Sequence, residues 1–332
     1  MHATYLLVIR RPRIEDGAEQ AELTGYLAWL AGRMETLVVD GSPPEVFRAH
    51  HAAWTPHATH IAPSPGMRSL NGKAAGVNTG LRAARTEAVI IADDDVRYDD
   101  ASLAAVLAHL EHAEVVRPQN FFRPSPWHAL WDTARTLLNR ASGGDWPGTL
   151  GVRTSALPYG YDGDVLFENL ELCRTVRALG GRESVPLDLY VRRLPPRSGH
   201  FWSQRVRQAY DEFARPGRLA MQLAIVPSVC ALVTTRRGRA LAGLAGAVLA
   251  AAEFGRRRSG GVGYFPALAT FLAPIWVIER GVCVWIALAL RLGRGGVPYG
   301  EGVLRVAAHS IPSIRRRLQR LARAQAAREA SS

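Results

Sequence analysis

Ala88 to Ala92 form a run of five apolar residues that leads directly into three aspartates, Asp93, Asp94 and Asp95. A short, uninterrupted apolar run fits a β-strand that is buried on both faces, as in the parallel sheets of α/β proteins. Ligands of such sheets bind at the carboxyl ends of the strands. The run therefore predicts a parallel strand whose end carries an acidic, ligand-facing cluster.

Similar apolar runs alternate with helical stretches through the first two thirds of the chain. We expect strands at 5–9, 36–39, 59–62, 88–92, 114–116, 149–153 and 187–191. We expect helices near 18–33, 74–84, 102–112, 127–140 and 167–179. This alternation is typical of an α/β fold with a mostly parallel sheet flanked by helices. We place this domain at 1–213 of the 332 residues.

The crowded aspartates point to a bound cation, because neighbouring carboxylates repel one another unless a positive charge neutralises them. Asp93 and Asp95 are separated by one residue, a spacing that could hold Mn²⁺ or Mg²⁺ against a diphosphate. The alternative is an acidic turn after a strand. For Asp99 and Asp100 we favour a structural role, in which one of them caps the next helix.

Two segments before the aspartates carry polar residues at positions where a ligand could bind. Asp40 closes the apolar stretch Leu37-Val38-Val39 and is followed by Gly-Ser. Lys73, in Asn71-Gly72-Lys73, opens a predicted helix, where free backbone amides and a cation can meet an anion. The segment is not a Walker loop, because GxxxxGK[ST] is absent.

In order and spacing, these three segments resemble those of family 2 glycosyltransferases of the GT-A fold, over about residues 1–215. The resemblance implies that Asp40 contacts the base or ribose of a nucleotide-sugar donor, and that Lys73 lies in the segment preceding the DxD motif. Asp93, Asp94 and Asp95 occupy the DxD position, which implies donor binding at Asp93 and a divalent metal at Asp93 and Asp95.

Two further motifs of the family are present in altered form. Asp162 to Leu172 is similar to the helix start that supplies the catalytic base, but Asn169 stands where the family has aspartate, so the base would be Glu168 or Asp164, with Glu168 preferred. Gln204-Arg205-Val206-Arg207-Gln208 resembles QxxRW with glutamine in place of tryptophan. Arg207 would stabilise the leaving diphosphate, and Gln204 would share its helical face.

His200, just before this motif, could be a metal ligand or a loop histidine, and we favour the loop. The three cysteines, Cys173, Cys230 and Cys283, are widely spaced and predict neither a disulfide framework nor a zinc module.

The rest of the chain, 214–332, is basic and apolar. It carries 18 Arg against four Glu, whereas 1–213 carry 23 Lys and Arg against 25 Asp and Glu. Apolar runs at 219–235, 240–254 and 262–290 are flanked by arginines, and Ile314, Leu318 and Leu321 lie on one face of a basic tail. We expect a helical, membrane-associated region, with a helical domain or surface-lying helices as the alternative.

The sequence thus predicts an inverting, metal-dependent glycosyltransferase of the cell membrane with a cytoplasmic catalytic domain. The donor would be a nucleotide-sugar, and the acceptor a lipid, lipid-linked or cell-envelope molecule. A nucleotidyltransferase and a non-catalytic sugar-nucleotide or membrane scaffold remain as alternatives. A nucleic-acid partner is not expected, because the positive charge lies beside apolar runs and no nucleic-acid motif is present.

Overall fold

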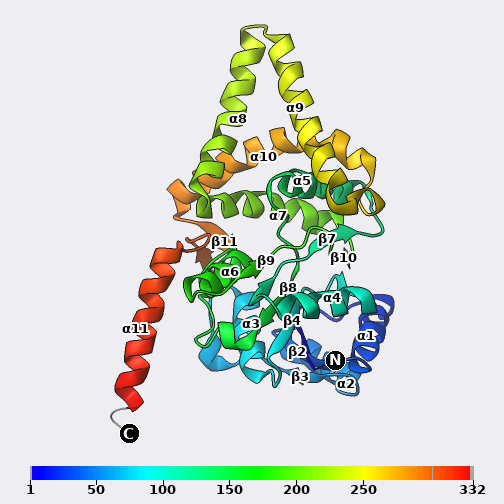
Figure 1. The fold of residues 1–332 in the computed structure, drawn as a ribbon, viewed down its shortest axis with the longest axis vertical. Coiled ribbons are helices and arrows are strands. Elements are labelled where there is room, and N and C mark those ends of the chain that lie inside the picture. Colours follow the sequence, from blue (N-terminus) through cyan, green and yellow to red (C-terminus); the bar gives the residue numbers. More distant parts are fainter. Residues whose placement is uncertain (1, 301, 330–332) are drawn as a thin grey trace.

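A seven-stranded sheet lies at the centre of the computed structural model, which describes residues 2–300 and 302–329 (Figure 1). Its strand order is β3-β2-β1-β4-β8-β6-β9. The strands are β1 (Thr4–Ile9), β2 (Glu35–Asp40), β3 (Thr59–Ile61), β4 (Ala88–Ala92), β6 (Val115–Val116), β8 (Thr149–Arg153) and β9 (Glu183–Ser184). All but one of these strands have a parallel neighbour, which confirms the expected mostly parallel sheet.

The exception is β8, which runs antiparallel to both of its neighbours, β4 and β6. The chain therefore enters β8 at the end of the sheet where β4 leaves it. As a result the backbone N–H of Asp93 donates to the carbonyl oxygen of Gly148 at 2.8 Å. This reversal places the loop before β8 directly beside the aspartates.

Helices cover both faces of the sheet, because its central strands are apolar on both sides. Tyr5, Leu7 and Ile9 of β1 face one core, which is completed by α1 (Gly17–Ala31), α2 (Pro44–Trp54) and α4 (Asp100–Leu110). Leu6 faces the other core, against α3 (Gly72–Ala83) and α6 (Glu168–Ala178). The α4 helix is capped by Asp99 in a capping box with Ser102, as expected of an aspartate at this position.

A second, three-stranded sheet in the order β5-β10-β7 stands beside the acidic end of β4. It is formed by β5 (Val96–Arg97), β7 (Gln119–Phe122) and β10 (Tyr190–Arg193), and α5 (Trp127–Ser142) follows β7. The strand that we expected at 187–191 therefore begins three residues later, at Tyr190. The sequence analysis did not predict β7 or α2. His200, which we expected in a loop, lies in the first turn of α7 (Ser198–Tyr210).

The C-terminal region consists of long helices that lie against the first part of the chain (Figure 1). The α8 (Pro216–Thr234) and α9 (Gly238–Arg257) helices form a projecting hairpin, and α10 (Ala267–Arg294) crosses beneath it. Residues of α5, α9 and α10 share one buried cluster. The chain then forms the hairpin of β11 (Val297–Tyr299) and β12 (Gly302–Leu304) and returns to the segment before α6, where Val306 bridges to Val165.

The final helix, α11 (Ile311–Glu329), packs beside α6. Ile314 and Leu318 are buried there, whereas Leu321 is exposed. The apolar face that we associated with a membrane surface is therefore largely covered by protein, because α6 occupies it. The three cysteines are free, as expected.

The contact between α9 and α5 depends on a glycine. A Cβ atom at Gly255 would lie 1.9 Å from the carbonyl oxygen of Leu137, whereas one at Gly243, in the same helix, would meet nothing within 4 Å. We expect Gly255→Ala to lower the free energy of unfolding by ~1–3 kcal/mol, the usual effect of overpacking. Gly243→Ala should raise it by up to about 1 kcal/mol through helix propensity.

Thermal unfolding of both variants in detergent measures the difference. Equal melting temperatures for the two variants would contradict the close packing of α9 on α5.

Candidate active site

The three aspartates after β4 are each paired with a cation from a different element. Lys73 Nζ, on α3, lies 2.6 Å from Asp93 Oδ1. Arg193, at the end of β10, reaches both Asp93 Oδ2 (3.3 Å from Nη2) and Asp95 Oδ2 (2.8 Å from Nε). Asp94 pairs with Arg11, which follows β1. The strand order therefore gathers three carboxylates and three cations at one edge of the sheet.

Asp93 and Asp95 both pair with the guanidinium of Arg193, so their carboxylates already share one cation. Burial raises the pKa of Asp95 to about 6, against the opposing effect of Arg193. No cluster of three or more histidine, cysteine or acidic side chains suited to a metal occurs among the described residues. The pair fits a divalent ion of the kind that takes one or two carboxylates and completes its shell with substrate phosphates, with Arg193 moved aside.

Lys73 also binds a second carboxylate. Its Nζ lies 2.7 Å from Glu168 Oε1, at the start of α6. Burial alone would lower the pKa of Lys73, but the charges of Asp93 and Glu168 outweigh it and raise that pKa. Asn71 caps α3 by accepting from the N–H groups of Lys73 and Ala74, which fixes the place of the lysine at the helix start.

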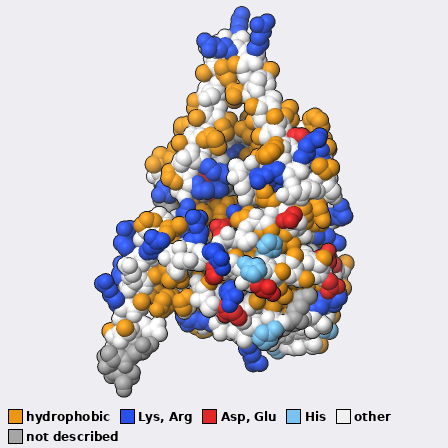
Figure 2. Space-filling view, in the orientation of Figure 1, with side chains coloured by type: hydrophobic (Ala, Val, Ile, Leu, Met, Phe, Trp, Pro, Cys, Tyr) orange, Lys and Arg blue, Asp and Glu red, His pale blue; other side chains and the backbone are white. Residues whose placement is uncertain are grey.

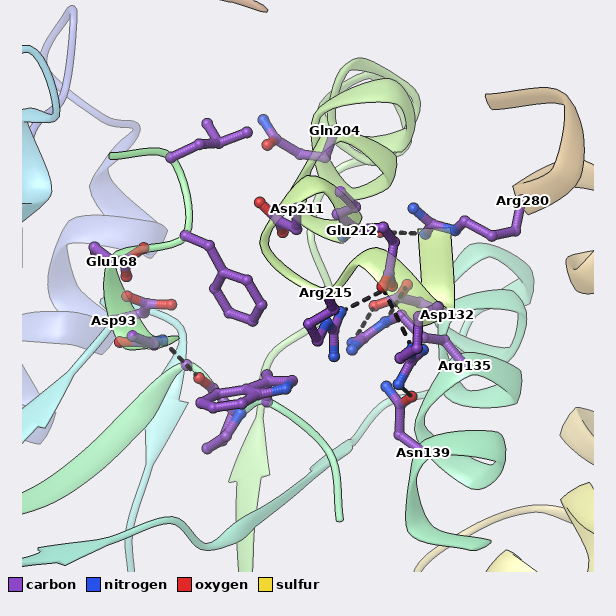
Figure 3. Close-up of a pocket in the computed structure, with 18 of the residues that line it drawn as sticks. Asp93, Asp132, Arg135, Asn139, Glu168, Gln204, Asp211, Glu212, Arg215 and Arg280 are labelled. Carbon is purple, nitrogen blue, oxygen red and sulfur yellow. Dashed lines mark hydrogen bonds and ion pairs between the residues drawn. The ribbon is translucent and has the colours of Figure 1, made fainter. Parts of the chain in front are cut away.

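Two adjoining cavities lie at this edge of the sheet. The lysine cavity, about 440 Å³, is lined by Lys73, the three aspartates, His200, Arg207 and Tyr299. The arginine cavity, about 260 Å³, is lined by Arg135, Arg215, Arg218, Arg280 and Trp276 (Figure 3). The residues that line both include Asp93, Glu168, Arg193, Gln204, Gln208 and Asp211. The cavities therefore meet at Glu168 and Asp211.

Of the two predicted bases, the structure places only Glu168 at the cavities. Asp164 lines neither of them, and its Oδ1 accepts from the N–H of Leu70 at 2.8 Å. Asn169 donates from Nδ2 to the carbonyl oxygen of Pro147 at 3.1 Å, beside the same cavity as Glu168. The substitution of asparagine at this position is thus accommodated by a bond to the loop before β8.

Gln204 and Arg207 both line the lysine cavity, as their shared helical face predicts. Arg207 lies over the ring of Tyr299 at 4.3 Å, and its buried Nε has no hydrogen-bond partner. Within the described residues no carboxylate lies within 4.0 Å of its nitrogens, so its charge is available to an anion. Burial and the charges of Arg207 and Arg193 lower the pKa of His200, which disfavours its charged form.

Asp40 is buried away from both cavities. Its carboxylate accepts from His50 Nδ1 (2.6 Å), His60 Nε2 (3.2 Å) and the N–H of Ser42 (2.8 Å). Burial alone would raise the pKa of Asp40, but these hydrogen bonds outweigh it and hold the pKa well below its usual range. Ser42 Oγ in turn accepts from the N–H of Arg11, so Asp40 fixes the loop that leads to the Asp94 ion pair.

Sequence reasoning missed Asp211, which lines both cavities and forms no hydrogen bond or ion pair with another described side chain. Burial and the nearby charge of Glu168 raise the pKa of Asp211 to about 8. A signal was present, because Asp211 follows Gln204 by seven residues and Arg207 by four, the spacing of one helical face. Arg193 and Arg280 had no comparable signal, since they reach the site from distant elements.

Comparisons with known proteins agree with this arrangement. Residues 32–155 match the family model for glycosyl transferase family 2. This match agrees with the resemblance to family 2 glycosyltransferases found in the sequence. No curated protein sequence matches the chain.

Among solved structures, the chain is similar to the mannosyltransferase PcManGT from Pyrobaculum calidifontis, determined with GDP-Man and Mn²⁺. The two share 19% identity over 86% of this chain and 87% of that chain, with a TM-score of 0.51, which shows a common GT-A type fold. A mannosyl-3-phosphoglycerate synthase from Rubrobacter xylanophilus shares 14% identity over 62% of this chain and 70% of that chain. Its TM-score of 0.43 is too low for a comparison of sites.

Proposed function

We propose that the protein is an inverting glycosyltransferase that moves a sugar from a nucleotide-sugar to a hydroxyl of a lipid, lipid-linked or cell-envelope acceptor. The observation that carries this proposal is the meeting of two cavities at Glu168 and Asp211. One cavity holds cations suited to a diphosphate, and the other leaves space for an acceptor next to the carboxylates. Residues 1–213 would supply the chemistry, and 214–332 would hold the enzyme at the membrane.

Donor binding is assigned to the lysine cavity. Lys73, Arg193 and Arg207 would bind the diphosphate, because all three cations line this cavity. A divalent ion held by Asp93 and Asp95 would supply further neutralisation of the leaving diphosphate. Gln204 would donate a hydrogen bond to the diphosphate. Asp40 would hold the loop at Ser42 in place, and this loop would contact the base or ribose.

Transfer requires a carboxylate that accepts the proton of the attacking hydroxyl. The hydroxyl oxygen bonds to the anomeric carbon as the bond to the diphosphate breaks on the opposite face, and the nucleoside diphosphate leaves with the electron pair. Glu168 is the base that the sequence predicts, but Lys73 already neutralises it. Asp211 has no such partner, and we propose it as the second candidate for the base.

The membrane part of the proposal is supported by the α8–α9 hairpin. Both α8 and α10 are long and apolar enough to cross a bilayer. Only 6% of the most apolar stretch of α8 is buried inside the protein, against 39% for α10. Figure 2 shows apolar side chains along the projecting hairpin and basic side chains at its tip, where Arg236, Arg237 and Arg239 lie. We propose that this hairpin enters the bilayer while the catalytic domain stays on the cytoplasmic side.

Donor binding tests the enzyme class directly. We expect one of UDP, GDP, dTDP and CDP to bind the detergent-purified full chain more tightly with Mn²⁺ than without it, because an ion held by Asp93 and Asp95 would add positive charge for the diphosphate. Asp95→Asn should abolish the Mn²⁺ dependence. Asp164→Asn, outside both cavities, serves as the control and should preserve it.

Isothermal titration calorimetry measures all three proteins. No binding of any nucleotide would contradict the donor site, and unchanged Mn²⁺ dependence in Asp95→Asn would contradict the metal assignment.

Loss of the base should affect turnover and spare donor binding. General-base catalysis contributes ~10²–10⁴-fold, so the variant that removes the base, Glu168→Gln or Asp211→Asn, should lower kcat by about that factor. A base with its pKa raised to about 8 is protonated below that pH. If Asp211 is the base, wild-type kcat/KM, which reports the pKa of the free enzyme, should therefore rise with pH up to about 8 and level off above it.

Nucleotide release, followed by a coupled assay across pH 5–9, measures these rates. Full activity in both variants would exclude both carboxylates. Donor binding without turnover in the wild type, across a panel of acceptors, would favour the scaffold alternative.

Insertion of the hairpin predicts binding to lipid bilayers through α8 and α9. We expect the full chain to float with phosphatidylcholine vesicles in a density gradient. Val233→Glu with Leu244→Glu, two exposed apolar positions on the hairpin, should reduce the floating fraction severalfold, because each replaces apolar surface that would contact lipid with a charge. Leu179→Glu, an exposed apolar position on the catalytic side, should float as the wild type does. Equal flotation of all three proteins would contradict insertion of the hairpin.

A further inference from the structure

Arg280 of α10 is a buried cation without an anion. Its side chain is 2% exposed and lines the arginine cavity (Figure 3). Only Nη2 has a hydrogen-bond partner, Gln208 Oε1 at 3.2 Å, whereas Nε and Nη1 have none. Among the described residues no carboxylate lies within 4.0 Å of its nitrogens. The aromatic ring of Trp276, 5.0 Å away, is its other close neighbour.

The other arginines that line only this cavity each form an ion pair with a carboxylate. Arg135 pairs with Asp132 at 3.2 Å and with Asp145 at 2.6 Å. Arg215 and Arg218 share a single carboxylate, that of Glu212, at 2.8 and 3.3 Å. Among the described residues, Arg280 is therefore the one arginine lining this cavity that has no ion pair, and it is also the most deeply buried of them.

A buried guanidinium with unpaired donors is costly unless an anion completes it. Arginine presents its N–H groups in a planar fork that matches the oxygens of a phosphate. The donor diphosphate does not account for Arg280, because Lys73, Arg193 and Arg207 already serve it in the lysine cavity, where Arg280 is not a lining residue. We therefore expect Arg280 to bind a second anion, which the acceptor would carry.

The surroundings indicate what carries this anion. The cavity, at about 260 Å³, is smaller than the ~300–1,000 Å³ of pockets that enclose whole drug-sized ligands, so it suits a head group. Ile278, Val282 and Ile286, on the same helix as Arg280, are exposed to the outside. One helix thus offers a buried cation to a head group and an apolar surface to lipid chains.

We propose that the arginine cavity binds the phosphate of a phosphate-bearing lipid acceptor, with Arg280 as the principal contact and Arg215 and Arg218 beside it. The proposal rests on the proposed glycosyltransferase function and names its acceptor class. The phosphate would hold the acceptor on the side of Glu168 and Asp211 opposite the lysine cavity, so that a hydroxyl of the same head group faces the donor sugar.

The test uses the full chain in detergent micelles and three probes. These are dioleoyl phosphatidic acid, which carries a phosphate monoester, dioleoylglycerol, which lacks it, and soluble glycerol 3-phosphate. Arg280→Gln removes the charge, and Arg218→Gln does so at a position whose side chain is 33% exposed and tolerates substitution more easily. Arg239→Gln, at the tip of the hairpin, is the matched control for loss of one positive charge.

We expect the wild type to bind phosphatidic acid more tightly than dioleoylglycerol. Arg280→Gln should weaken phosphatidic acid binding by roughly tenfold or more, as expected for lost hydrogen bonds to a charged group. Arg218→Gln should weaken it by a smaller factor, and Arg239→Gln should leave it unchanged. Binding of the nucleoside diphosphate, measured on the same samples, should be retained in all variants and reports that they are folded.

Equal phosphatidic acid binding by wild type and both cavity variants would overturn the proposal, and Arg218→Gln decides the matter if Arg280→Gln does not fold. Binding of glycerol 3-phosphate as tight as that of phosphatidic acid, and equally dependent on Arg280, would overturn the lipid source. Absence of nucleotide binding in the wild type would instead contradict the glycosyltransferase function, while Arg280-dependent phosphate binding would still support the anion site.

Discussion

Lys73 connects the parts of the molecule on which the site depends. Its ammonium group lies between Asp93, at the end of β4, and Glu168, at the start of α6, with 2.6 and 2.7 Å contacts. Without this cation, two carboxylates would face each other in a half-buried cavity, where their repulsion is poorly screened. The position of the lysine follows from Asn71, which caps α3 and also donates to the carbonyl oxygen of Val165 just before α6. One helix start thus fixes both acidic segments.

The C-terminal region contributes to the site as well as covering it. Arg205 of α7 pairs with Glu279 of α10 and with Asp132 of α5, so three helices from distant parts of the chain are held together by buried charges. Asp132, one member of this network, lines the arginine cavity. The boundary near residue 214 therefore separates regions of different composition, but the cavity needs both of them.

Much of the fold was predictable, because the central strands are continuous apolar runs and the helices between them have clear starts and stops. β4 and β8 were predicted to the residue, and β1 within one residue. The prediction failed for β7 and misplaced β10, because each of these strands has only four residues. It also missed α2, whose buried face carries His50 between Val46 and Trp54. His200 was expected in a loop, whereas α7 begins two residues before it.

The sequence by itself determined that Asp93, Asp94 and Asp95 lie at the carboxyl end of β4, because the apolar run of that strand leads directly into them. It also determined that Gln204 and Arg207 share a face. Only the tertiary structure decided which cations pair with the aspartates, that Asp164 lies outside the cavities, and that Arg280 is buried without an anion. These facts depend on contacts between residues about 50 to 150 positions apart, such as Arg193 with Asp95 and Arg205 with Glu279, and no local pattern encodes such distances.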